Sequence, residues 1–203
     1  FILTANIDLS GLTFTEAPIA PDTDSVAGEF QGIRFTGIFD GQGHVISNLT
    51  IDQPEKDFIG LFGYVGSGGQ IRNLGVVNAN ITGRNYVGGL VGANGVPDQY
   101  GGSIASCYVT GSVKGTLSFV GGLVGENYKG LTTSCYATGT VTGIGNYSSE
   151  VGGLVGFNYN GSITSCYATG AVSGHYFVGG LAGDREELKI QSSKCKIEVS
   201  PMG

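Results

Sequence analysis

The sequence is poor in tryptophan, histidine and charge. Its 203 residues contain no tryptophan and two histidines, and 13% of them are charged, with a formal net charge of -6. A protein that binds a phosphate backbone needs a basic surface, and this composition does not supply one. No apolar run approaches the roughly 20 residues of a membrane-spanning helix. We therefore expect neither a nucleic-acid partner nor insertion into a membrane.

Glycine, in contrast, is abundant, at 38 residues, far above the roughly 7% of ordinary chains. The Gly-X-Y period of collagen is absent, and proline contributes five residues. Apolar residues make up 40% of the chain and recur in register, which argues against a disordered polypeptide. We expect a single domain with a packed core.

Two short blocks recur along the chain and define a repeat. The first reads Val-Gly-Gly-Leu-Val-Gly, with Ala for the second Val in its last copy, and begins at Val87, Val120, Val151 and Val178. The second begins Ser-Cys-Tyr and starts at Ser106, Ser134 and Ser165. Aligning the second block with two earlier segments gives a column with an average spacing of about 29 residues, formed by Leu49, Leu74, Cys107, Cys135 and Cys166. Because leucine and cysteine are both common in protein interiors, we expect this column in the core.

The residues around these blocks favour strands. Apolar and polar side chains alternate, and Val, Ile, Thr and Tyr lie between the glycines. Equivalent residues once per turn predict an all-β, single-stranded parallel β-helix (a β-solenoid) with about three short strands per coil. Right-handed coiling is expected from the chirality of parallel crossovers. We divide this one domain into N-terminal coils or a cap (1–44), repeats (45–183) and a charged C-terminal cap (184–203).

The cysteines allow more than one interpretation. Stacked coils place Cys107, Cys135 and Cys166 about 4.8 Å apart at their Cα atoms, within the range that a disulfide tolerates. Their side chains run parallel into the core, which favours free thiols, and a disulfide between Cys166 and Cys195 is the alternative. No Cys-x-x-Cys pair is present, and the imidazole ligands are limited to His44 and His175, so we expect no metal site and no cofactor.

Three tyrosines are the candidate binding residues. Tyr108, Tyr136 and Tyr167 are expected to point outward from successive coils. A row of such rings can bind a surface glycan or a protein, and it can equally serve only to stabilise the sheet. Asparagines that follow the glycine block predict an amide ladder at a corner: Asn94, Asn127 and Asn158.

Catalytic residues are harder to find. Acid–base chemistry needs carboxylates and a cation that converge on one face, and the repeats nearly lack charge. Asp40 and His44 share a turn, but Asp-Gly-x-Gly is first of all a turn sequence. We assign no catalytic residue and expect a protein that is not an enzyme. The alternatives are a polysaccharide-active β-helix enzyme (a lyase or hydrolase) that uses Asp40 or His44, and a glycan-binding appendage of a larger secreted enzyme.

The repeated Gly-Gly-Leu-Val-Gly with intervening Ser-Cys-Tyr-Ala-Thr-Gly resembles the GLUG-motif repeats of bacterial surface and secreted proteins. The resemblance covers about residues 35 to 183, including Phe39-Asp40-Gly41-Gln42-Gly43-His44 before the repeats. It implies an exported β-solenoid, extracellular or at the cell surface, with no shared catalytic residues. Together with the repeated outer face, it leads us to expect a structural or adhesion module whose partner is a second copy of itself or a surface glycan or protein.

Overall fold

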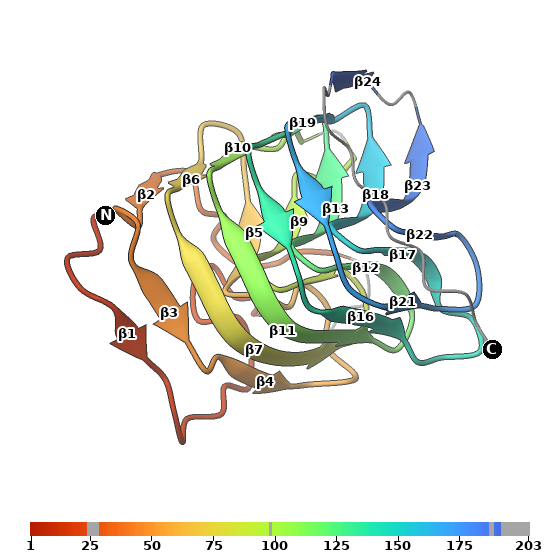
Figure 1. The fold of residues 1–203 in the computed structure, drawn as a ribbon, viewed down its shortest axis with the longest axis horizontal. Coiled ribbons are helices and arrows are strands. Elements are labelled where there is room, and N and C mark those ends of the chain that lie inside the picture. The colour runs from red at the N-terminus through yellow and green to blue at the C-terminus, as the bar shows by residue number, and fades with distance from the viewer. Residues whose placement is uncertain (24–28, 98, 187–188, 192–203) are drawn as a thin grey trace.

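The computed structural model describes residues 1–23, 29–97, 99–186 and 189–191 (Figure 1). Its regular elements are strands, and their neighbours in each sheet are parallel. The chain therefore winds as a β-solenoid, which confirms the predicted fold class. Within the described residues no helix is long and apolar enough to cross a membrane.

From Gly75 onward each coil passes through four sheets, which we call B, D, C and A in chain order. In the preceding coil an isolated bridge between Ile59 and Val87 takes the place of the sheet D strand. Sheet A contains β2 (Ile38–Asp40), β6 (Gln70–Arg72), β10 (Ser103–Ala105), β14 (Leu131–Thr133), β19 (Ser162–Thr164) and β24 (Lys189–Gln191). Sheet B contains β1 (Ile7–Asp8), β3 (Val45–Ser47), β4 (Thr50–Asp52), β7 (Gly75–Gly83), β11 (Tyr108–Gly115), β15 (Tyr136–Ala137), β16 (Thr140–Gly143), β20 (Tyr167–Ala168) and β21 (Val172–Ser173). Sheet C contains β5 (Phe62–Val65), β9 (Val91–Asn94), β13 (Val124–Tyr128), β18 (Val155–Tyr159) and β23 (Ala182–Glu186). Sheet D contains β8 (Val87–Gly88), β12 (Ser118–Gly121), β17 (Ser149–Gly152) and β22 (Val178–Gly179).

The glycine block explains why there are four sheets where the sequence predicted about three strands. The block Val-Gly-Gly-Leu-Val-Gly is not one continuous strand, because it forms the end of a sheet D strand and the start of a sheet C strand. The Gly-Leu pair between them turns the chain, and the leucine at this turn is buried in the core at Leu90, Leu123, Leu154 and Leu181. Each coil is therefore folded inward on itself, so that sheets C and D pack against each other.

The register of sheet B fixes the core columns. Val76, Val109, Ala137 and Ala168 lie next to one another, and so do Ile81, Val113, Val141 and Val172. Ile46 precedes Val76 in the first of these columns, and Ile51 precedes Ile81 in the second.

Leu49 is the one member of the proposed cysteine column that the register excludes. Because Val45 pairs with Gly75 and Thr50 pairs with Asn80, Leu49 lies beside Ala79 and not beside Leu74. It is fully buried, but in another column. A turn at Gly41–His44 precedes this segment, and the left-handed Asn48 (φ 61°) lies beside Asn78 (φ 57°), which is also left-handed, and not beside Asn73.

The proposed cap boundaries do not interrupt the stack of coils. At the N-terminal side β1 pairs with β3 and β2 pairs with β6. At the other side β23 pairs with β18 and β24 pairs with β19. The coiling therefore continues past residue 183 to at least Gln191.

Candidate functional site

The three predicted tyrosines form a continuous row on the outside of sheet B. The rings of Tyr108 and Tyr136 are 4.8 Å apart at an angle of 5°, and those of Tyr136 and Tyr167 are 4.9 Å apart at 4°. The register pairs these residues directly, so the ring spacing follows the spacing of parallel strands. Tyr108 and Tyr136 are half-buried, and Tyr167 is 39% exposed.

This stacking determines which atoms the row presents. Both faces of the Tyr136 ring are covered by its neighbours, and the Tyr108 ring lies against Gly75, where a Cβ would come within 2.5 Å of its Cζ atom. The row therefore presents ring edges and hydroxyl groups at a repeat of about 4.8 Å. A sugar that stacks on an aromatic ring needs a free face, which Tyr136 does not offer.

Replacing Tyr136 with alanine is expected to lower the free energy of unfolding by about 1–3 kcal/mol, because two stacked ring pairs worth about 0.5–1.5 kcal/mol each are lost. Tyr136→Phe keeps both pairs and should stay within about 0.5 kcal/mol of the parent. Urea unfolding of the two variants measures the difference. Equal losses in both would mean that the hydroxyl, and not the stacking, holds the row.

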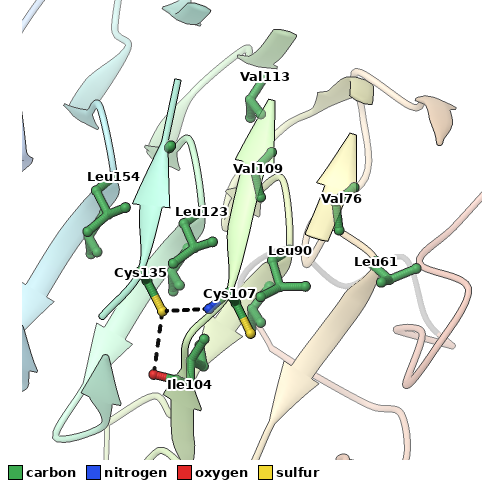
Figure 2. Packing of buried hydrophobic residues seen from close by; sticks show 14 of the residues in the cluster. Leu61, Val76, Leu90, Ile104, Cys107, Val109, Val113, Leu123, Cys135 and Leu154 are labelled. Carbon is green, nitrogen blue, oxygen red and sulfur yellow. Dashed lines mark hydrogen bonds between the residues drawn. The ribbon is translucent and has the colours of Figure 1, made fainter. Parts of the chain in front are cut away.

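Leu74, Cys107, Cys135 and Cys166 each directly precede a strand of sheet B and are buried in successive coils. Figure 2 shows Cys107 and Cys135 side by side in the core. The cysteines are buried free thiols, and the Cys107 amide donates to the Cys135 sulfur at 3.4 Å. Hydrogen bonding with the Cys107 thiol is the main cause that raises the pKa of Cys135, to about 12, so this thiol is inert at neutral pH. Cys195, the proposed partner of Cys166, lies outside the described residues.

The corner asparagines form a buried amide ladder. Nδ2 of Asn94 donates to Oδ1 of Asn127 at 2.9 Å, and Nδ2 of Asn127 donates to Oδ1 of Asn158 at 2.7 Å. All three side chains are fully buried. Each link satisfies polar atoms that would otherwise be costly to bury, so the ladder ties successive coils together.

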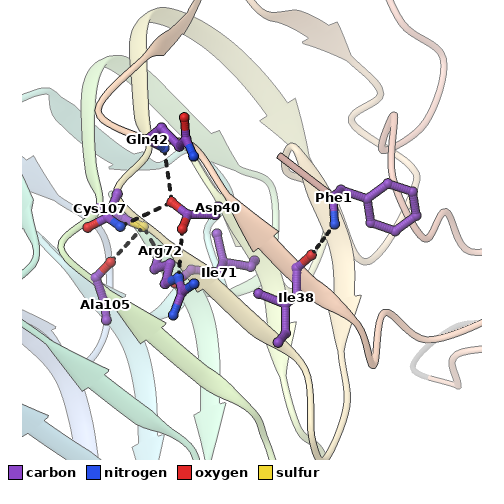
Figure 3. Close-up of polar contacts among 9 residues, drawn as sticks. Phe1, Ile38, Asp40, Gln42, Ile71, Arg72, Ala105 and Cys107 are labelled. Atoms are coloured by element: carbon purple, nitrogen blue, oxygen red, sulfur yellow. Dashed lines mark hydrogen bonds and ion pairs between the residues drawn. The ribbon is translucent and has the colours of Figure 1, made fainter. Parts of the chain in front are cut away.

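Asp40 and His44 do not form a pair. Oδ2 of Asp40 accepts from Nε of Arg72 at 2.9 Å, and its other oxygen accepts from Asn73 and from the Gln42 amide (Figure 3). The hydrogen bond from Asn73 is the main cause that lowers the pKa of Asp40, so this carboxylate is a poor general base near neutral pH. Nδ1 of His44 lies 3.2 Å from Oδ1 of Asn6. No group of three possible metal ligands is found among the described residues.

Glu126 is a buried carboxyl that the sequence did not reveal. It lies in sheet C in register with Ala93 and Phe157, is 3% exposed, and its Oε2 atom has no hydrogen-bond partner. Tyr64 and Ala93, which occupy the same column in the two preceding coils, form a second buried cluster with Phe58. Burial raises the pKa of Glu126 to about 8. The local sequence Gly-Glu-Asn resembles a polar surface strand, and the signal that could have found the residue is its position between Ala93 and Phe157 in the repeat alignment.

The family model for the GLUG motif matches residues 120–142 and 147–173. These are GLUG repeats. Each matched segment runs from sheet D through sheets C and A into sheet B, so one GLUG motif corresponds to about one coil. The resemblance inferred from the sequence is confirmed for this part of the chain.

Two proteins are similar to this chain in sequence, and one solved structure is similar to it in fold. Halomucin from Haloquadratum walsbyi is 38% identical over 133 residues, which is 62% of this chain and 1% of halomucin. A protein of Evansella cellulosilytica, provisionally named a Gly-rich membrane protein, is 39% identical over 70 residues, 32% of this chain and 8% of that protein. The crystal structure of a provisionally named immunoglobulin A1 protease from Bacteroides ovatus has a TM-score of 0.56 at 20% identity, and covers 98% of this chain and 70% of that one. The last comparison shows the shared fold, and the chain spans a small part of the first two relatives.

Proposed function

We propose that this chain is a non-enzymatic, extracellular β-helical module that acts in structure or adhesion as part of a larger surface protein. The observation that carries the proposal is the repeated outer face: side chains recur in rows at the strand spacing, as in the Tyr108, Tyr136 and Tyr167 row. A surface of this kind suits a long or repetitive partner better than a small substrate.

The relatives support a location at the cell surface. Halomucin is by its name a mucin, and the Evansella protein is by its name a membrane protein. The small share of halomucin that this chain covers supports a role as one module among many. The side-chain rows then supply contacts that repeat along such a polymer.

The distribution of exposed apolar residues favours association through the ends of the stack. Most large exposed apolar side chains of the described residues lie near one end or the other: Phe1, Ile2, Ile7, Leu12, Ile33 and Ile38, and Ile144, Tyr147, Tyr167, Tyr176, Phe177 and Val178. The flanks between them carry Tyr100, Leu117 and Leu131. Among the described strands, β1 at one end and β20 to β24 at the other each have a parallel partner on one side only, and such edges readily pair with another chain.

Replacing Ile2 with lysine is expected to weaken self-association by at least about tenfold, because the new charge loses its water when the end is covered. Ile2 is 64% exposed, so the fold itself should tolerate the change. Leu131→Lys is the matched control, since Leu131 is 42% exposed on the flank formed by sheet A. Sedimentation velocity and electron microscopy measure the oligomers. A parent chain that stays monomeric, or an equal effect of both variants, would remove the support for end-to-end assembly.

A polysaccharide-active enzyme is the second candidate, because Asp40 and Arg72 bring a carboxylate and a guanidinium together on an exposed face. The discriminating assay is the release of unsaturated or reducing sugars from a panel of polysaccharides. Release that disappears in Asp40→Asn would favour the enzyme over the structural module.

A further inference from the structure

Two adjoining cavities lie where the segment around Arg34 meets the loop between β9 and β10. The smaller has a volume of about 290 Å³ and is lined by Arg34, Thr36, Gly66, Ser67, Gln99 and Tyr100. The larger, of about 380 Å³, shares Arg34 and Gln99 and includes Phe30, Tyr64 and Tyr86. These volumes are near the lower end of the roughly 300–1,000 Å³ typical of ligand sites, which suits one or two sugar rings.

The backbone on both sides of the smaller cavity is fixed. Val96 and Gln99 exchange two hydrogen bonds of 3.1 and 2.8 Å, and the Gly101 amide donates to the Tyr128 carbonyl at 3.0 Å. These bonds hold the loop on both sides of Tyr100. On the other side, the Phe35 amide donates to Tyr64 and the Phe35 carbonyl accepts from Gly66, each at 3.0 Å. Arg34 and Thr36 therefore flank an anchored residue, and the site is organised before any ligand arrives.

The side chains of this site match a sugar acid. Arg34 is exposed, and its guanidinium lies 5.5 Å from the Tyr64 ring, with no carboxylate partner among the described residues. Tyr100 is 58% exposed, and the Lys129 ammonium lies 4.8 Å from its ring centre. No acidic side chain lines the smaller cavity, although the chain as a whole is acidic; Glu29 lines the larger one, and Asp98 lies outside the described residues.

Gln99 adds a hydrogen-bonding group at the centre of the site. Its Oε1 accepts from the Tyr64 hydroxyl at 3.3 Å, which orients the side-chain amide so that the NH₂ group serves as a donor. The hydroxyls of Thr36 and Ser67 line the same cavity and can both donate and accept. A guanidinium, an amide, two hydroxyls and an exposed phenol ring are the groups that bind a carboxylate, sugar hydroxyls and the apolar face of a pyranose.

We propose that the smaller cavity, which opens as a groove between Arg34 and Tyr100, binds a carboxylate-bearing sugar: a hexuronic acid residue of an acidic polysaccharide. Arg34 takes the carboxylate, with the field of Lys129 supporting it, Gln99, Thr36 and Ser67 take the hydroxyls, and Tyr100 contacts the ring. The proposal deepens the adhesion function above by naming its ligand class, and places binding at a groove distinct from the tyrosine row of sheet B.

The test is a titration of the whole chain with trigalacturonate and, separately, with the neutral trisaccharide maltotriose, followed by calorimetry or NMR. Binding of the uronate and at least about tenfold weaker binding of maltotriose are expected. Arg34→Gln should weaken uronate binding about tenfold to a hundredfold, and Tyr100→Ala about tenfold. Lys114→Gln, which removes one positive charge from β11 on sheet B, is the matched control and should change affinity less than about twofold at moderate salt.

Three results would overturn the proposal: no uronate binding, equal affinity for both trisaccharides, or an equal loss in Arg34→Gln and Lys114→Gln. Far-ultraviolet circular dichroism of each variant shows that the fold is retained, and the exposed positions of Arg34 and Tyr100 make this the expected outcome. If uronate binding fails while Ile2→Lys still dissociates the oligomer, the ligand assignment falls and the structural function stands. If both fail, the adhesion function falls with it.

Discussion

Replacing Glu126 with glutamine is expected to raise the free energy of unfolding by roughly 3–5 kcal/mol at pH 8.5 and to leave it nearly unchanged at pH 4. The carboxyl is 3% exposed, and its Oε2 atom has no hydrogen-bond partner. Burial therefore penalises the charged form and raises the pKa to about 8, from an ordinary value of about 4.5. Glutamine resembles the neutral acid in size and polarity, but it cannot ionise.

The direction of the pH dependence follows from this pKa. Below about pH 4.5 the carboxyl is mostly protonated in both the folded and the unfolded chain, so its ionisation does not lower the free energy of unfolding. As the pH rises towards 8, the unfolded chain releases the proton and the folded chain retains it, so stability falls by up to about 1.4 kcal/mol per pH unit. The stability that the neutral carboxyl allows is present at low pH and is lost as the pH rises to about 8.

Urea unfolding between pH 4 and 9 measures this difference. Glu150→Gln is the matched control, because Glu150 is half-buried and accepts a hydrogen bond from Ser149. The control should leave the pH profile of the parent in place, whereas Glu126→Gln should flatten it. A Glu126→Gln profile parallel to that of the parent would show that Glu126 is solvated or paired in the folded protein. The expected result also predicts a module that is more stable in mildly acidic than in alkaline surroundings.

The repeats made the core columns predictable from the sequence. Cys107, Cys135 and Cys166 could be aligned because Ser-Cys-Tyr marks the same point of three successive coils, and parallel stacking carries that alignment directly into space. Leu49 could not be placed in this way. Its segment lacks the block, and the register places it beside Ala79, five residues beyond the Leu74 position to which the alignment assigned it.

The candidate binding groove was beyond sequence reasoning for a different physical reason. Arg34 belongs to the first coil, and Gln99 and Tyr100 belong to a loop whose length differs between coils. Neither segment contains one of the recurring blocks, so the repeat spacing of about 29 residues does not predict that the two segments lie side by side. Glu126 was missed because a carboxylate between Gly125 and Asn127 is usually solvated, and its burial depends on how sheets C and D close over it.

Replacing Gly121 with alanine is expected to abolish stable folding, with a loss of more than about 4 kcal/mol out of the roughly 5–15 kcal/mol that hold a domain together. A Cβ at this position would lie 2.0 Å from the Val124 carbonyl oxygen, 2.7 Å from the Gly156 nitrogen and 2.8 Å from the Leu154 oxygen. All three are backbone atoms of the sheet ladders, so no side-chain rotation relieves the contact. The two sheets would have to separate, which would expose the core around Leu123.

Gly37→Ala is the control for this prediction, because a Cβ there would meet ring atoms of Phe35 at 3.6 Å, an ordinary contact. Circular dichroism and urea unfolding should find Gly37→Ala within about 0.5 kcal/mol of the parent. A folded Gly121→Ala with near-parent stability would contradict the close packing of sheets C and D.

The same close contact recurs in the other copies of the glycine block. A Cβ added to Gly88, Gly152 or Gly179 would lie 2.1, 1.9 or 1.8 Å, respectively, from a backbone carbonyl oxygen. Each coil thus requires its first glycine for the same steric reason, so alanine at Gly152 should be as damaging as at Gly121. The repeated glycine block is therefore a steric condition of the inward fold in these four coils.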